Sequence, residues 1–143
     1  MFDGATAFNQ SVEHFDTSKV TSMFNVFRNA ENFNQPLNSW NTSNVTDMEG
    51  MFTNASSFNQ PLDNWDTSKV TFMNEMFKSA LMFNQSLDNW NISSISSDAR
   101  IKDIFLDSGL EEDNYCKLFK GKSKEIWTKY KSVLGVSSLY DCN

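Results

Sequence analysis

The chain has 143 residues, of which 39% are hydrophobic and 21% charged, enough for one domain with a buried core. Its formal net charge of −6 argues against a nucleic-acid backbone or an anionic membrane surface as a partner. No run of 18 apolar residues could cross a bilayer, and the first ten residues lack the pattern of a signal peptide. One histidine and two cysteines argue against most zinc sites, most histidine-based catalysis and a disulfide framework.

Residues 1–100 consist of four copies of a 25-residue unit that align without gaps. Each unit repeats a Phe, an Ala, a Phe-Asn-Gln triplet, an aliphatic residue and an aromatic residue at fixed positions. One such column contains Phe33, Phe58 and Phe83. A single unit cannot bury enough apolar surface to fold, so we expect the units to stack as the coils of a solenoid, with identical side chains above one another.

Within a unit, the apolar spacing changes along the chain. Apolar residues at 45, 48, 51, 52 and 55 have the spacing of a short helix, which Thr42 and Ser43 could cap. Residues 33–40 lack this spacing and are typical of an extended segment. The sequence therefore predicts an α/β repeat solenoid of four coils, each with one short helix and one short strand or extended segment.

The Asn-Gln pairs, such as Asn59-Gln60, recur in every unit. We interpret them as ladders whose side-chain amides bond to the coil above or below, or cap backbone groups at a corner. The alternative is a polar strip that binds a ligand.

The sequence from 101 to 143 departs from the repeat and predicts a separate C-terminal part beside the four-repeat solenoid of 1–100. The apolar pattern around Phe105 matches that around Phe77 at a spacing of 28 rather than 25, which indicates a degenerate fifth repeat and helix with three inserted residues. Acidic residues at 111–113 and Ser123 mark the starts of two more helices. We expect these helices to form a cap with one apolar and one polar face.

The unit MFTNASSFNQPLDNWDTSKVTFM resembles the BspA-like surface-protein repeat, also called the mycoplasmal lipoprotein repeat. The segment GLEEDNYCKLFKG is similar to the one that often closes such arrays. The resemblance implies a leucine-rich-repeat-like fold and a place on a surface or secreted protein, with a role in adhesion or ligand binding. It implies no activity and no cofactor. Because Met1 aligns with the middle of a repeat, we expect either a fragment of a longer protein or a first coil left open.

Acidic residues recur beside the Trp column, as Asp63 and Asp66 and as Asp88 with Asn91. Calcium binds such oxygen clusters, but the charge is not maintained in every unit, so turn and cap chemistry is the simpler interpretation. The one imidazole, His14, stands beside Glu13 without an evident nucleophile. We therefore expect neither a metal site, a cofactor nor an enzyme.

The two cysteines, Cys116 and Cys142, both lie in the C-terminal part. In an exported protein they could pair and tie the C-terminus to the helix at 111–120. The sequence leaves this pairing and two free thiols equally open.

A binding array holds its core constant and varies its outer columns. Phe24, Phe72, Leu81 and Met82 are apolar where the other repeats are mostly polar, so they are candidates for contact with a partner. They could instead pack under the cap or against another chain in an oligomer. We expect a non-enzymatic module that recognises a protein or a glycan on a cell surface. The alternative is a structural spacer that self-associates through an open first coil.

Overall fold

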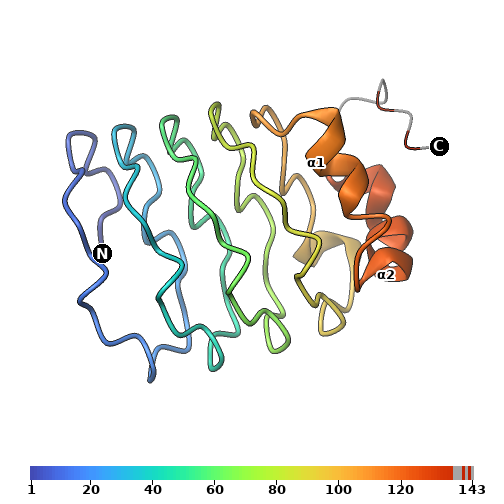
Figure 1. Cartoon of the computed structure of the whole chain (residues 1–143), viewed down its shortest axis with the longest axis horizontal. Coiled ribbons are helices and arrows are strands. Elements are labelled where there is room, and N and C mark those ends of the chain that lie inside the picture. Colours follow the sequence, from blue (N-terminus) through green and yellow to red (C-terminus); the bar gives the residue numbers. More distant parts are fainter. Residues whose placement is uncertain (137–139, 141, 143) are drawn as a thin grey trace.

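The computed structural model describes residues 1–136, 140 and 142. The repeats lie side by side along the long axis of the molecule, and the helices gather at its C-terminal end (Figure 1). The helical elements are a 3-10 turn η1 (Asp98–Arg100), α1 (Glu112–Lys117), α2 (Lys124–Tyr130) and a 3-10 turn η2 (Lys131–Val133). Among these described residues, no helix has the length and apolar content needed to cross a bilayer. Residues 137–139, 141 and 143 of the predicted C-terminal cap lie outside them.

The prediction of an α/β repeat solenoid is wrong. No α helix begins before Glu112 in the part of the chain that the structure describes, and there is no sheet. The only strand-like contacts in that part are isolated parallel bridges from Asp47 to Ser22 and to Phe72. Each 25-residue unit is instead a coil of turns and extended backbone.

The helix expected over 45–55 does not form because the backbone twice enters the left-handed region. Gly50 has φ of 61° and Asn54 has φ of 59°, and a right-handed helix cannot include such residues. Each of these residues lies within a tight turn, closed by the N–H of Met51 donating to Met48 O and by that of Ala55 donating to Phe52 O. The three-residue spacing of the apolar residues therefore reflects successive turns rather than a helix.

Hydrogen bonds between coils run in one direction over residues 48–54, whereas just before them the N–H of Thr46 donates back to Thr21 O of the preceding coil. Every second N–H donates to a carbonyl of the next coil, and the N–H groups between them close turns within their own coil. The stretch therefore directs N–H groups toward the C-terminal end and carbonyls toward the N-terminal end. In the second coil, the N–H groups of Met48, Gly50, Phe52 and Asn54 donate to the carbonyls of Phe72, Asn74, Met76 and Lys78.

Aromatic rings form the core in continuous files, which confirms that equivalent side chains stack. Phe33, Phe58 and Phe83 are fully buried, with centroid distances of 5.9 and 6.1 Å between successive rings. A second file contains Phe52 and Phe77 at 5.6 Å, and the two files contact each other within each coil. A single coil cannot provide this stacking, so contacts between neighbouring coils hold the repeats together.

The fifth repeat has the predicted register but is not the predicted helix. Phe105 stacks on Phe77 at 6.0 Å despite the spacing of 28 residues. The 3-10 turn η1 directly precedes this segment. Asp103 and Asp107 repeat the left-handed conformations of the earlier coils, so this segment is also a run of turns.

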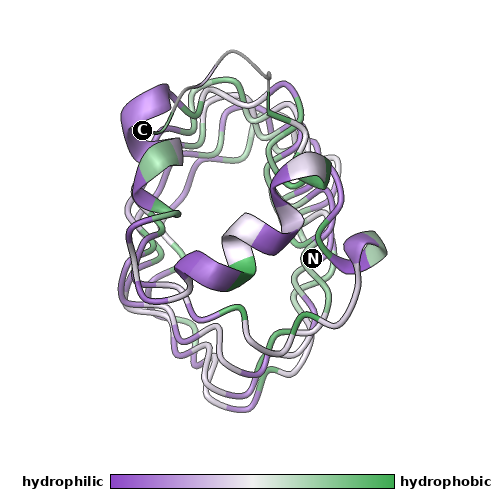
Figure 2. Ribbon diagram, turned by 90° about the vertical axis from the view of Figure 1, so that its right-hand side faces the viewer, coloured by the Kyte–Doolittle hydropathy of each residue, from purple (hydrophilic) through white to green (hydrophobic). Residues whose placement is uncertain are grey.

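Helices α1 and α2 cover the C-terminal end of the stack, where α2 crosses in front of the coils (Figure 2). Trp127 of α2 is fully buried against Phe105, with a ring distance of 6.1 Å. The segments around the helices approach the fourth coil closely at two glycines. A Cβ on Gly109 would lie 2.2 Å from the carbonyl oxygen of Leu81, and one on Gly121 would lie 2.3 Å from that of Asp88. Side chains at these positions would push the cap away from the coils.

The buried tryptophans differ in their hydrogen bonds, which gives a matched test of the stack. Trp65 Nε1 donates to Leu37 O at 2.9 Å, whereas Trp127 Nε1 is the one buried side-chain polar atom of the described residues without a partner. We expect Trp65→Phe to cost at least about 1 kcal/mol more unfolding free energy than Trp127→Phe, because only the first leaves a carbonyl without its donor. Urea unfolding of the two variants measures this difference, and equal losses would contradict the expectation.

Candidate binding surfaces

The Asn-Gln pairs form the predicted ladders. Asn59 Oδ1 accepts bonds from the N–H of Asn84 at 2.9 Å and from Gln85 Nε2 at 2.8 Å. The ladder ends at α1, where Asn84 Oδ1 accepts from Glu111 N–H and from Asn114 Nδ2, both at 3.0 Å. These oxygens are used in holding coils together, which disfavours a ligand-binding strip.

The Asp and Asn residues after the Trp column act in turns, as predicted. Asp66 Oδ1 and Asn91 Oδ1 each accept a bond at 3.0 Å from the N–H two residues later. The bonds from Ser68 hold the pKa of the Asp66 carboxyl below its usual value. Within the described residues, no three His, Cys, Asp or Glu side chains come close enough to hold a metal ion.

A column of threonines has a role that sequence reasoning missed. Thr42 does not cap a helix; it is buried, and its hydroxyl donates to Asp66 O of the next coil at 3.0 Å. Thr17 and Thr67 make the same bond at 3.1 and 3.0 Å. Their regular 25-residue spacing was the available signal for buried polar residues that join the coils.

Three of the four apolar partner candidates are exposed. Leu81 and Met82 are neighbours with 60% and 61% of their surface accessible, and Phe24 has 51%. Phe24 lies in the first coil, whereas Leu81 and Met82 lie in the fourth, so the candidates do not form a single patch. Phe72 is only half-exposed, and the guanidinium carbon of Arg100 lies 3.6 Å from its ring centroid. Its ring is therefore already covered on one face by a cation.

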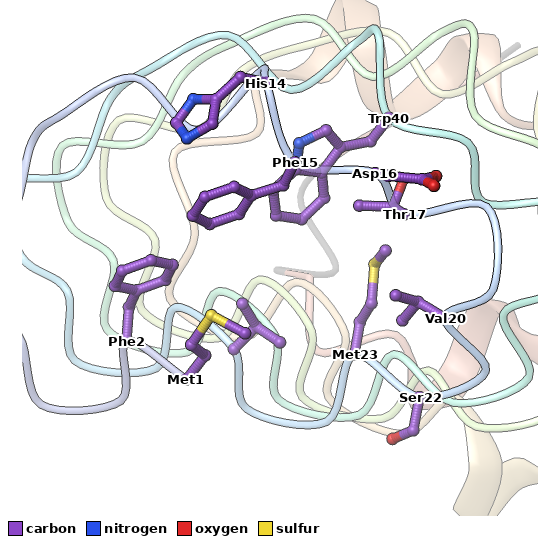
Figure 3. Close-up of a pocket in the computed structure, with 11 residues that line it drawn as sticks. Met1, Phe2, His14, Phe15, Asp16, Thr17, Val20, Ser22, Met23 and Trp40 are labelled. Atoms are coloured by element: carbon purple, nitrogen blue, oxygen red, sulfur yellow. The ribbon is translucent and has the colours of Figure 1, made fainter.

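The N-terminal end of the stack has an apolar hollow of about 540 Å³ (Figure 3). Met1, Phe2, Phe15, Met23 and Trp40 contribute its apolar lining. In the later coils, the equivalent face is covered by the preceding coil, as where Phe27 stacks on Phe2 at 5.4 Å. The lone histidine, His14, borders the same hollow with its ring edge-on to Phe15 at 4.6 Å.

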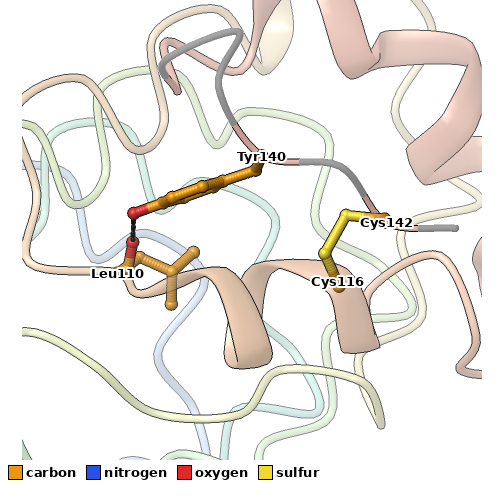
Figure 4. Close-up of a disulfide and its surroundings, with 4 residues drawn as sticks. All are labelled: Leu110, Cys116, Tyr140 and Cys142. Atoms are coloured by element: carbon orange, nitrogen blue, oxygen red, sulfur yellow. Dashed lines mark hydrogen bonds between the residues drawn. A yellow bond between two sulfur atoms is a disulfide. The ribbon is translucent and has the colours of Figure 1, made fainter.

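At the other end, the two cysteines are joined in a disulfide (Figure 4). The bond links Cys116 of α1 to Cys142, with the Cα atoms 5.2 Å apart. Tyr140 lies beside it and donates its hydroxyl to Leu110 O at 3.1 Å. Cys142 and Tyr140 are thereby tied to α1 and to the residue before it.

The comparisons with known proteins identify a family but not a function. A family model described as "Mycoplasma protein of unknown function, DUF285" matches residues 1–112, which include the whole repeat region. No curated protein and no solved structure matches the chain significantly. Because the match covers most of the chain, the chain is a member of the DUF285 family.

Proposed function

We propose that the chain is a non-enzymatic binding module of a surface or secreted protein, which recognises a protein or glycan through its exposed face. The resemblance to BspA-like repeats supports adhesion as the setting. The disulfide at the C-terminal end supports a location outside the reducing cytosol, because such bonds persist mainly in oxidising compartments.

The observation that carries this proposal is the exposed pair Leu81 and Met82. Their columns contain Glu31 and Asn32 in the second coil and Ser56 and Ser57 in the third. The coil geometry therefore tolerates polar residues at these positions, and stability does not require apolar ones. Adjacent exposed apolar side chains on a stable scaffold favour contact with a partner.

The test compares the chain with the variant Leu81→Ser/Met82→Ser, which introduces the residues that the third coil has at these positions. Binding to panels of immobilised extracellular-matrix proteins and of glycans would be measured by biolayer interferometry. We expect saturable binding to at least one ligand, and at least a tenfold loss of affinity in the double variant with an unchanged melting temperature. Phe24→Glu, which introduces the residue of the second coil, tests the other exposed position. Absence of saturable binding, or equal binding by the variants, would contradict the proposal.

A second candidate function, self-association of a structural spacer, is favoured by the apolar hollow at the N-terminal end. Hydrogen-bond direction restricts how copies could stack there. If two copies met through their N-terminal faces, the backbone carbonyls of the stretch that contains Met1 and Asp3 would face the same carbonyls of the other copy. The N–H groups of this stretch that bond between coils all point toward the C-terminal end, so they could not pair with those carbonyls. Light scattering of the purified chain at low and high protein concentration separates the two functions. A chain that stays monomeric at every concentration disfavours the spacer.

A further inference from the structure

Residues 117–131, at the C-terminal end of the stack, carry a charge opposite to that of the coils. Residues 117–131 contain six lysines and one glutamate, whereas the whole chain has a net charge of −6. All six lysines are exposed, and within the described residues none of them is in a salt bridge. This positive charge is therefore available to an anionic ligand. The six are Lys117, Lys120, Lys122, Lys124, Lys129 and Lys131.

Helix α2 determines where part of this charge lies. Trp127 and Tyr130 are buried beneath the helix, so the opposite side faces outward. At the 100° rotation per residue of a helix, Glu125, Thr128 and Lys129 lie on that side, and all three are exposed. Figure 2 shows α2 crossing the end of the molecule, with its outer side unobstructed in that view.

A hollow of about 450 Å³ lies next to this helix, between α2 and the disulfide-linked segment. Lys129 and Lys131 line it together with the hydroxyl-bearing Thr128 and Ser132. The partly exposed Tyr140 supplies aromatic surface to the same hollow, whereas Tyr115 borders it as a buried side chain. A pocket of this size that combines cations, hydroxyls and aromatic rings suits a small polar ligand such as a sugar unit.

Ring contacts hold both ammonium groups in place. Lys129 Nζ lies 4.8 Å from the ring centroid of Tyr130 and 3.2 Å from its hydroxyl, and Lys131 Nζ lies 5.3 Å from the ring centroid of Phe119. A side chain already positioned loses less conformational entropy when it binds an anion.

We propose that this hollow binds an acidic glycan, whose carboxylate or sulfate groups contact Lys129 and Lys131 while a sugar ring packs on Tyr140. Among the described residues after Gly109, no large apolar side chain is exposed that could insert into a lipid surface. The disulfide supports an oxidising compartment, in which extracellular glycans are available as ligands.

This inference rests on the proposed function for its extracellular setting, but it concerns a different surface from Leu81 and Met82. The two surfaces can therefore fail independently. The glycan site lies on the C-terminal helices, whereas the apolar pair belongs to the fourth coil.

The test uses the full chain with its disulfide intact. Heparin and polygalacturonate serve as sulfated and carboxylated probes, dextran as the neutral one, and phosphatidylglycerol vesicles and duplex DNA as the other anions. At 0.15 M salt we expect binding to at least one acidic glycan, and at least a tenfold loss of affinity in Lys129→Ala/Lys131→Ala. The matched control, Lys19→Ala/Lys102→Ala, removes the same charge from exposed positions elsewhere and is expected to change affinity less than twofold.

Several outcomes would overturn the inference. These are no binding to either acidic glycan, equal losses in the two double variants, or tighter binding to vesicles or DNA than to glycan. A loss in Leu81→Ser/Met82→Ser with none in Lys129→Ala/Lys131→Ala would refute the lysine site and leave the proposed function standing. Equal melting temperatures exclude unfolding as the cause of any loss.

Discussion

Replacing Phe52 by Ala is expected to lower the free energy of unfolding by about 3–5 kcal/mol, the usual range for a phenylalanine removed from a core. Phe52 is fully buried in the middle of its file. Its ring lies 5.7 Å from that of Phe27, 5.6 Å from that of Phe77 and 4.1 Å from that of Phe58. The cavity would interrupt the file between coils as well as the contact within one.

Because each coil contacts only its neighbours, a cavity in the third coil should also weaken the coupling between the two ends of the stack. We therefore expect a broader urea transition in Phe52→Ala, measured by circular dichroism and by the fluorescence of the buried tryptophans. Phe24→Ala is the matched control, because Phe24 has 51% of its surface exposed and its truncation should cost less than about 0.5 kcal/mol. A loss below about 1.5 kcal/mol in Phe52→Ala, or similar losses in both variants, would contradict this account of the core.

The repeat was predictable because one physical requirement, the burial of identical side chains on one another, fixes both its period and its core. The stacking of Phe33 on Phe58 and the use of Asn59 in a ladder both followed from this requirement. The shifted register that brings Phe105 onto Phe77 followed from it as well. Periodicity specifies which residues meet between coils, whatever the backbone does within one coil.

The backbone of a single coil was mispredicted because apolar spacing alone does not separate a helix from a run of turns. A signal was present in two columns of left-handed residues, at Asn25 and Gly50 and at Asn29 and Asn54. Gly and Asn tolerate positive φ better than other residues, and their recurrence four residues apart argues against a continuous helix. Local conformational preference here carried information that the hydrophobic pattern lacked.

The candidate surfaces were only partly predictable. Their departure from polar columns marked Leu81 and Met82 but left exposure and packing under the cap both open, and the structure shows them exposed. The position of Arg100 over Phe72 depends on the three inserted residues that follow the fourth coil. The hollow beside Lys129 and Lys131 depends on how α2 packs across the stack. Because α2 is not part of a repeat, no repeated sequence pattern predicts which residues it contacts.

Reduction of the disulfide is expected to lower the stability of the C-terminal cap by about 3 kcal/mol, since the bond closes a loop between residues 26 apart in sequence. Its loss would free the segment that positions Tyr140, whose hydroxyl bonds to Leu110 O at 3.1 Å. The melting temperature with and without reductant, and that of Cys142→Ser, measure the effect. Cys142 is half-exposed, so this substitution removes the bond without leaving a buried cavity.

The coils should respond differently from the cap. Their ladders and phenylalanine files do not involve either cysteine, so hydrogen exchange of amides such as Phe52 and Asn54 should remain slow after reduction, while amides of α1 exchange faster. The matched control is reductant added to Cys142→Ser, which should cause no further change. An unchanged melting temperature and unchanged exchange in α1 would show that the cap is held by the packing of Trp127 and by the ladder to Asn84 rather than by the disulfide.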